Sequence, residues 1–169
     1  MRLDEAARVA TEDDTGQIVA LARSALAELS AQRGGVVWSR RDARVEPIDS
    51  GIAAAIAESA GGGSGLVAAG TIDDVVVGYA VVRDEVVADG GHLGVVEDLY
   101  VEPGARGVGV GAALMNLIVD WAGEHGCFGI DSIALPGDRA TKNFFESFGL
   151  VARAITVHRS LPSGEDRLD

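Results

Sequence analysis

The chain has 169 residues, of which 47% are hydrophobic and 24% charged, as is typical of one globular domain that buries its own core. Its formal net charge of -12 argues against binding to nucleic acid or to an anionic membrane, because the long-range field is repulsive. The N-terminal MRLDEAARVA lacks the apolar core of a signal peptide, and the single Cys127 excludes an internal disulfide, so we expect a cytoplasmic protein.

Hydrophobic periodicity predicts an alternation of strands and helices along the chain. Apolar side chains at helical spacing mark the helices, and apolar runs bounded by glycines or acids mark the strands. The basic stretch 36–46 shows neither pattern and is expected to be irregular. The expected elements are a strand at 7–10, a helix from 11 to the Gly34-Gly35 pair, a helix that contains 52–56, strands at 66–72, 75–82 and 95–101, a helix at 109–124, a strand at 129–135, a helix at 139–148 and a strand at 150–159.

This order predicts one α/β domain over residues 1–161, followed by a polar tail at 162–169. The acidic pair Asp73-Asp74 is expected to form the hairpin turn between two of the strands. Asp138 precedes the helix at 139–148, where its carboxylate is expected to cap the helix N-terminus. We find no internal repeat and no domain boundary.

The segment EPGARGVGVGAAL, residues 102–114, places four glycines at the start of a strongly amphipathic helix. Such a helix start presents free N–H groups and a partial positive charge, which favours a phosphate. A Walker loop needs Gly-Lys-Ser/Thr at its end, and Gly-Ala-Ala stands there instead. The dinucleotide pattern Gly-x-Gly-x-x-Gly/Ala is met by 107–112, but Pro103–Arg106 separates it from the preceding strand, so an NAD(P)-binding Rossmann protein stays only as an alternative.

A third ligand, coenzyme A, follows from a family resemblance. Arg106-Gly-Val-Gly-Val-Gly111 matches the Arg/Gln-x-x-Gly-x-Gly/Ala pattern of the GNAT superfamily of acyl-CoA-dependent N-acyltransferases. The surrounding VVEDLYVEPGARGVGVGAAL resembles the central strand, turn, loop and helix of that family. A second family pattern, close to Asn-x-x-Ala-x-x-Phe-Tyr-x-x-x-Gly-Phe, keeps its spacing from Asp138 to Leu150. The resemblance covers residues 95–150.

This resemblance implies a fold, a donor and a set of binding residues. The fold is a mixed, mainly antiparallel sheet of six to seven strands with helices on both faces. The donor is acetyl-CoA, without a metal, bound where the strand at 95–101 splays from the strand at 129–135. Backbone groups of Leu99 and Val101 would meet the pantetheine arm. The residues that the resemblance assigns to the CoA phosphates are Arg106, Gly107, Val108, Gly109, Val110 and Gly111, with Asp138 and Lys142 as further candidates.

Glu97 and Asp98 are the candidate catalytic residues. An alkyl amine with a pKa of about 10.4 is protonated at pH 7, so a proton acceptor helps it to attack a thioester. In relatives with a Glu-Asp-Leu/Phe-x-Val strand the Glu is the general base, and Glu97 holds that position. Alternation along the strand predicts Glu97 on the face of Leu99 and Val101, and Asp98 on the face of Tyr100. A structural role for either acid stays open.

Phe145 departs from the family pattern, because many members carry a Tyr there that protonates the departing thiolate. A thiol with a pKa of about 8.5 leaves fairly well as a thiolate, so the loss of this acid need not abolish turnover. Water or the hydroxyl of Ser147 is a substitute. The alternative hypothesis is a non-catalytic domain that binds or senses acyl-CoA.

The acceptor is not determined by the sequence beyond a small-molecule amine or a peptide. In the family it is selected by the first two helices and their loop, here roughly residues 25–58. A second copy of the chain is kept as a partner, and no spacing of His, Cys and carboxylates predicts a metal site. The most distinctive residues of the acceptor region are Trp38, Arg40, Arg41 and Arg44.

Overall fold

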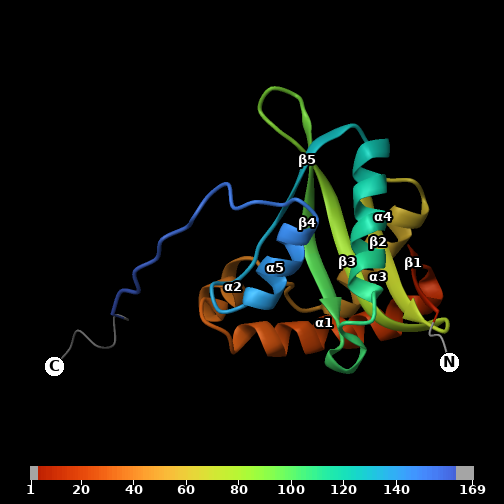
Figure 1. The fold of residues 1–169 in the computed structure, drawn as a ribbon, viewed down its shortest axis with the longest axis horizontal. Helices are drawn as coiled ribbons and strands as arrows, with labels where there is room; N and C mark the ends of the chain where they lie inside the picture. The colour runs from red at the N-terminus through yellow and green to blue at the C-terminus, as the bar shows by residue number, and fades with distance from the viewer. Residues whose placement is uncertain (1–3, 163–169) are drawn as a thin grey trace.

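A five-stranded sheet in the order β1-β2-β3-β4-β5 forms the centre of the computed structural model, which describes residues 4–162 (Figure 1). The neighbouring pairs β1–β2, β2–β3 and β3–β4 are antiparallel, whereas β5 runs parallel to β4. The sheet is therefore mixed and mainly antiparallel, as expected. The strands are β1 (Glu5–Val9), β2 (Gly65–Ile72), β3 (Val75–Val86), β4 (His92–Val101) and β5 (Cys127–Ser132).

Helices cover both faces of this sheet, so the core has two layers (Figure 1). On β2 the side chain of Val67 lies in the layer under α1 and α3, whereas its neighbours Leu66 and Ala68 lie in the layer under α4 and α5. Alternation along a strand thus supplies apolar side chains to both faces. The helices are α1 (Thr15–Ser30), α2 (Gly35–Arg41), α3 (Ile48–Ala60), α4 (Val110–Glu124) and α5 (Arg139–Ser147), with short 3-10 turns at Glu12–Asp14 and Pro103–Ala105.

Most expected elements are confirmed to within a few residues, and three expectations are wrong. The segment 36–46 is not wholly irregular, because α2 occupies its first half; the helix buries no apolar stripe, with Val36 69% exposed, so periodicity does not reveal it. Five strands stand where six to seven were expected. The strand expected at 150–159 is absent, because this stretch has no strand partner among residues 4–162. The tail at 162–169 lies almost wholly outside the described residues.

The turn between β2 and β3 forms as expected. Asp73 and Asp74 have φ angles of 48° and 67°, in the left-handed region that two-residue hairpin turns require. Short acidic side chains tolerate this region better than branched ones do. The Asp73 carboxylate also accepts a hydrogen bond from the backbone N–H of Asp4 at 3.0 Å, which links the turn to the residue before β1.

Strands β4 and β5 pair only along part of their length. Residues His92–Val96 of β4 run beside Cys127–Ser132, and the part of β4 from Glu97 to Val101 extends past this pairing. On the other side of β4, Val96 lies opposite Val82 and Asp98 opposite Val81, so Glu97 is an extra residue in a β-bulge. The second half of β4 is therefore paired to β3 alone.

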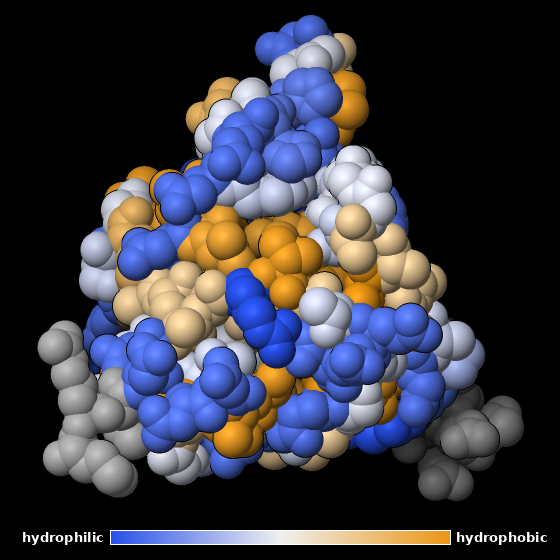
Figure 2. All heavy atoms as spheres, turned by 90° about the vertical axis from the view of Figure 1, so that its right-hand side faces the viewer, coloured by the Kyte–Doolittle hydropathy of each residue, from blue (hydrophilic) through white to orange (hydrophobic). Residues whose placement is uncertain are grey.

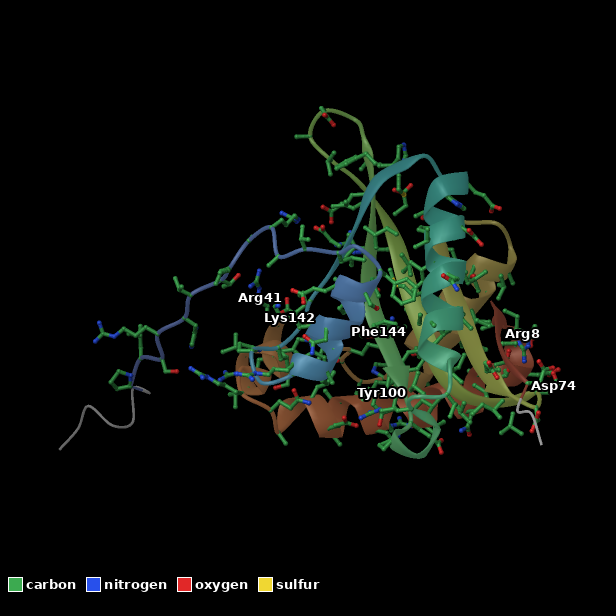
Figure 3. All side chains as sticks on the ribbon, in the orientation of Figure 1. Arg8, Arg41, Asp74, Tyr100, Lys142 and Phe144 are labelled. Atoms are coloured by element: carbon green, nitrogen blue, oxygen red, sulfur yellow. The ribbon has the colours of Figure 1, made fainter. Side chains whose placement is uncertain are left out.

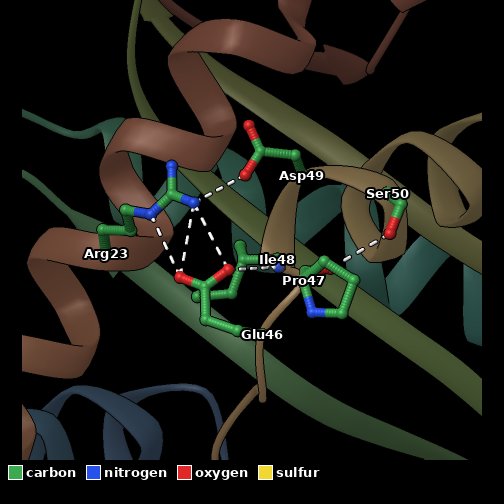
Figure 4. Close-up of polar contacts among 6 residues, drawn as sticks. All are labelled: Arg23, Glu46, Pro47, Ile48, Asp49 and Ser50. Atoms are coloured by element: carbon green, nitrogen blue, oxygen red, sulfur yellow. Dashed lines mark hydrogen bonds and ion pairs between the residues drawn. The ribbon is translucent and has the colours of Figure 1, made fainter.

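An arginine on α1 joins that helix to the beginning of α3 (Figure 4). Arg23 lies 3.3 Å from the Glu46 carboxylate and 2.5 Å from that of Asp49. The Glu46 carboxylate also accepts the backbone N–H of Ile48 at 2.9 Å. These pairs are largely exposed and contribute little to stability. They nevertheless tie down the end of the connection between α2 and α3, which carries Arg44.

At the β1 edge of the sheet, Arg8 and Asp14 form an ion pair that is more buried than the pairs of Arg23. Figure 2 shows this side of the molecule, where apolar side chains gather in the middle of the face and hydrophilic ones surround them. Arg8, at this edge in Figure 3, reaches both Asp14 oxygens, at 2.6 and 2.9 Å. The backbone N–H of Thr11 donates to the same carboxylate, of which only 7% is exposed. The bond from Arg8, reinforced by Thr11, lowers the pKa of Asp14 to about 2.

Asp14→Asn is expected to lower the free energy of unfolding by about 2 kcal/mol, because it removes a charge-assisted bond to Arg8. Asp14 has a depressed pKa, so its contribution is complete above about pH 4 and is lost as the pH falls through about 2. Urea unfolding between pH 2 and 7 measures both effects. Asp13→Asn, an exposed acid in the same turn, is the control. Equal losses in the two variants contradict the assignment.

Candidate active site

The two acidic residues of β4 lie together at the bulge. Arg44, from the connection between α2 and α3, bonds Asp98 through Nε and lies 3.6 Å from Glu97 through Nη2. The expectation that Glu97 and Asp98 point to opposite faces of β4 is therefore wrong, because both carboxylates lie beside the same guanidinium. The extra residue of the bulge interrupts the alternation, so one guanidinium reaches both carboxylates.

The Arg44–Asp98 pair of this cluster is largely shielded from solvent. Asp98 is 13% exposed and Arg44 22% exposed, and the Arg44 Nη2 atom is fully buried with no hydrogen-bond partner among residues 4–162. Tyr79, on the neighbouring strand β3, is 1% exposed. Burial raises the pKa of Tyr79 well above its usual value, and the nearby Asp98 raises it further, so the phenol stays neutral. Because Tyr79 is neutral, the charge that balances the largely buried Asp98 carboxylate comes from Arg44.

Glu97 is the more accessible of the two acids. Its carboxylate is 39% exposed and lies 3.0 Å from Arg83 on β3. It also lines a cavity of about 100 Å³ between α3 and strands β2 to β4. The other polar side chains of this cavity are Glu58, Ser64 and Arg83, and the rest of its lining is mainly apolar. A carboxylate at the wall of such a cavity can accept a proton from a small bound group.

The glycine segment begins α4 with a backbone conformation that favours glycine. Gly109 precedes the helix with a φ of 114°, which a residue with a side chain rarely adopts. A Cβ at Gly109 would also lie 3.0 Å from Cγ of Glu5, and one at Gly111 would lie 3.3 Å from the ring of Phe144. The first N–H groups of α4 have no partner within the helix. Glycine therefore leaves room at this helix start, beside which the Glu5 side chain lies.

The side chain of Arg106 is bound to the protein itself. Its Nε donates to the carbonyl oxygen of Val101 at 2.8 Å, and its Nη2 donates to Glu28 of α1 at 2.9 Å. Tyr100 lies under the guanidinium, 5.3 Å from it, and donates its hydroxyl to the same Glu28 carboxylate. The bond from Arg106 lowers the pKa of Glu28 against the opposing effect of burial. Arg106 thus joins the end of β4 to α1 and fixes the start of the loop.

Glu28 and Tyr100 are site residues that sequence reasoning missed. Glu28 is the only acid of α1 and stands between Ala27 and Leu29, and its partners are 72 and 78 residues away. Only the fold brings that helix beside the end of β4. The sequence feature that could have indicated this contact is Tyr100, two residues after Asp98 on an apolar strand. A tyrosine buried in a sheet needs a hydrogen-bond partner for its hydroxyl.

The other expected CoA residues converge on the same end of the molecule. Val101 lies 4.0 Å from the position of a Gly111 Cβ, so the end of β4 and the start of α4 are adjacent. Leu99 and Val101 pack partly buried under α4. Val110 is buried in that core, whereas Val108 is 39% exposed on the loop.

Helix α5 lies beside this loop through Phe144, which is labelled in Figure 3. The Asp138 carboxylate accepts the backbone N–H of Thr141 at 3.0 Å, so the expected helix cap is confirmed. Lys142 is 56% exposed and pairs with Glu146 of the same helix. Asp138 is thus occupied as a cap, whereas Lys142 keeps its ammonium at the surface.

Phe145 is 6% exposed and packs in the core layer under α4. The hydroxyl of Ser147 donates to the backbone carbonyl of Phe144 at 2.6 Å. Position 145 therefore offers no proton, and Ser147 is turned back onto its own helix. Within residues 4–162 no group of three His, Cys, Asp or Glu side chains is arranged to hold a metal ion, and no helix of this part is long and apolar enough to cross a membrane.

Known proteins share both the sequence pattern and the fold. A model of the acetyltransferase (GNAT) family matches residues 23–150. No curated protein matches the chain. Among solved structures, a transcriptional regulator from Bacillus halodurans C-125 is 21% identical with a TM-score of 0.66, and the match covers 94% of this chain and all of that one.

Two further solved structures carry acetyltransferase names. A ribosomal-protein-alanine N-acetyltransferase from Brucella melitensis is 16% identical with a TM-score of 0.67, over 94% of this chain and 100% of that one. The aminoglycoside N-acetyltransferase AAC(6′)-Iy, in complex with CoA, is 16% identical with a TM-score of 0.68, over 94% and 95% of the two chains. At these identities the likeness concerns the fold, and its mainly antiparallel sheet argues against the parallel dinucleotide-binding alternative.

Arg44→Gln is expected to lower the free energy of unfolding by about 2 kcal/mol, because it leaves the largely buried Asp98 carboxylate without its charged partner. Arg41→Gln is the matched control, since Arg41 ends α2 with 71% of its side chain exposed and should change stability little. Urea unfolding of both variants measures the difference. Similar free energies of unfolding for the two variants would show that the contacts of Arg44 contribute no net stability.

Proposed function

Because the chain belongs to the GNAT family of acetyltransferases, we propose that it transfers an acetyl group from acetyl-CoA to a primary amine by direct attack. One observation carries the proposal: an accessible carboxylate, Glu97, stands on the same strand that leads directly into the glycine segment at the start of α4. A proton acceptor and an anion site are thus joined by one short stretch of chain. This arrangement suits a donor with a phosphate at one end and a thioester at the other.

The residues present fit coenzyme A. Its pyrophosphate would accept hydrogen bonds from the backbone N–H groups of 107–111, at the positive end of α4. The chain carries a net charge of -12, so a polyanion needs such locally concentrated donors. The Arg106 side chain acts by holding this loop to Val101 and Glu28 rather than as a free phosphate ligand. The ammonium of Lys142, 56% exposed on the neighbouring helix, pairs with Glu146 and would exchange that partner to bind an outer phosphate.

The second half of β4 suits the pantetheine arm. From Glu97 to Val101 the strand is paired only with β3, so its other edge offers backbone groups to an extended ligand. Leu99 and Val101 are the residues proposed to make these contacts. The thioester at the end of the arm would then reach the bulge that carries Glu97. Bound acetyl-CoA supplies the activated acyl group, and the protein supplies position and proton transfer.

Glu97 is proposed to take the proton of the attacking amine. The nitrogen attacks the thioester carbonyl, the C–S bond breaks, the thiolate leaves, and the proton passes to the Glu97 carboxylate directly or through a water. Asp98 is less suited to this step, because it is bonded to Arg44 and more deeply buried. A thiolate whose conjugate acid has a pKa of about 8.5 can leave without being protonated. The absence of a proton donor at Phe145 therefore does not prevent this step.

The acceptor is proposed to be a small cationic amine or an unhindered amine of a peptide. The cavity beside Glu97 is small, and its charged side chains are Glu58, Glu97 and Arg83, so two carboxylates face one guanidinium and the balance favours a positive charge. The named neighbours act on an aminoglycoside in one case and on a ribosomal protein in the other, so acceptor class varies within the fold. The connection that carries Arg44 borders the acids and is expected to contribute to acceptor choice.

A non-catalytic acyl-CoA-binding domain is the second candidate, favoured by the buried Phe145. Release of free thiol from acetyl-CoA, measured with a panel of diamines, amino acids and peptides, separates the two functions. Amine-dependent release supports the transferase. Tight CoA binding without release for any amine supports the binding domain.

Glu97→Gln is expected to lower kcat by about 100-fold at neutral pH, with a smaller loss at high pH where the free amine is abundant. Glu85→Gln is the matched control, because Glu85 lies 2.7 Å from the same Arg83 and is similarly exposed. Steady-state rates of thiol release from pH 6 to 10 measure both variants. Equal rates for Glu97→Gln and the wild type at every pH would remove Glu97 as the base.

Gly109→Ala is expected to raise the Kd of CoA by about tenfold, because an alanine at this φ is strained by about 1–2 kcal/mol and the loop would rearrange. Gly104→Ala is the control, since nothing lies within 4 Å of a Cβ there and its φ is ordinary. Calorimetric titration with CoA measures both. An unchanged Kd for Gly109→Ala means that the phosphates bind elsewhere.

A further inference from the structure

Helix α2 and its flanks form a basic stretch in an otherwise acidic chain. Residues 33–44 contain four of the 14 basic residues and only one of the 26 acidic residues, Asp42. At physiological ionic strength the field of a charge is screened over about 8 Å, so a ligand at this stretch meets its local charge rather than the net charge of -12. The local charge therefore favours an anionic group. The four cations are Arg33, Arg40, Arg41 and Arg44.

Only one of these arginines is engaged with the core of the fold. Arg44 bonds Asp98 and is 22% exposed. Arg33 and Arg40 are exposed and form no ion pair within residues 4–162. Arg41 is 71% exposed and its nearest carboxylate, 3.7 Å away, belongs to the residue that follows it. Three guanidinium groups thus stay open to solvent in a chain that is rich in acids.

The arginines at the end of α2 are close in the chain to the proposed reaction site. Arg44 lies beside both acids of the β4 bulge. Arg41 is the last residue of α2, three residues before Arg44, so the two Cα atoms are at most about 11 Å apart. In Figure 3, Arg41 lies on the side of the molecule that carries α2 and α5, opposite Arg8 at the β1 edge. The chain therefore ties these cations to the bulge, where the amine is expected to react.

Building on the proposed acetyl transfer, we propose that the acceptor is the α-amine of a peptide whose next residues are acidic. An α-amine has a pKa of about 7.7–8.0, against about 10.4 for a lysine side chain, so more of it is neutral at pH 7. Its nitrogen bonds to the acyl carbon, the C–S bond breaks, the proton of the nitrogen passes to Glu97, and the thiolate leaves.

Opposite charges along such a peptide match opposite charges along the protein. The cavity at Glu97 carries two carboxylates and one guanidinium, which suits the amine before it loses its proton. Residues of an extended peptide follow one another at about 3.3 Å, so positions two to four extend about 10 Å from the amine. This length is comparable to the span from Arg44 to Arg41. Carboxylates at these positions would form charge-assisted hydrogen bonds with Arg40 and Arg41.

Two peptide amides that differ only in charge test the acceptor class. With Ala-Glu-Glu-Glu, kcat/KM for thiol release from acetyl-CoA is expected to be about tenfold higher than with Ala-Gln-Gln-Gln. A third peptide, N-acetyl-Glu-Glu-Glu-Lys amide, offers only a lysine amine and is expected to react more slowly than the first. Equal values for the first two peptides overturn the acidic acceptor, and a faster third peptide overturns the α-amine.

Charge reversal at the end of α2 locates the preference. Arg40→Glu/Arg41→Glu is expected to bring the ratio of the two kcat/KM values close to one. Arg153→Glu/Arg159→Glu is the matched control, because it changes the net charge equally at exposed arginines after α5 and should keep the tenfold ratio. A control that loses the preference as well overturns the role of α2. A several-fold higher Kd of CoA for Arg40→Glu/Arg41→Glu assigns these arginines to the donor and also overturns the proposal.

Calorimetric titration of the CoA-bound protein separates this surface from the transfer reaction. If no amine releases thiol, the proposed function fails, yet the acidic peptide is still expected to bind about tenfold more tightly than the glutamine peptide. Loss of that difference in Arg40→Glu/Arg41→Glu supports the surface. Equal Kd values for the two peptides on the wild type overturn it. A single-stranded oligonucleotide of the same charge that binds more tightly than the acidic peptide overturns the peptide as the occupant.

Discussion

The separation of β4 from β5 after Val96 is the constraint on which the proposed site depends. Up to that residue the strands hold each other in a parallel pair, and beyond it β4 is attached only to β3. The bulge at Glu97 lies at this point. Because an extra residue disturbs the alternation of side chains, two consecutive acids come within reach of one arginine. The open edge and the reachable carboxylate therefore lie at the same point of the fold.

Arginines then hold the elements around this opening. Arg44 links the α2–α3 connection to the bulge, and Arg106 links the end of β4 to Glu28 on α1. In a chain with 26 acidic and 14 basic residues, these two cations lie where carboxylates are partly buried. They leave the proposed phosphate-binding role to the backbone N–H groups at the start of α4.

Features that depend on neighbouring residues in the sequence could be predicted. Features that depend on contacts between distant segments could not. The turn at Asp73-Asp74 and the cap by Asp138 depend on neighbouring residues and are confirmed. Helix α2 was missed because it buries no apolar stripe, and the bulge was missed because its register involves β3. The segment at 150–159 has the pattern of a strand, but a pattern does not specify a partner. The roles of Glu97 and of the loop 106–111 stay predictions.

The most direct test of the central claim is a crystal structure of the protein with bound acetyl-CoA. The account predicts the pyrophosphate within hydrogen-bond distance of the backbone N–H groups of residues 107–111. It also predicts the pantetheine along Leu99–Val101 and the thioester beside the Glu97 carboxylate, with Arg106 still bonded to Glu28. A pyrophosphate held away from the start of α4, or a thioester remote from the β4 bulge, would contradict it.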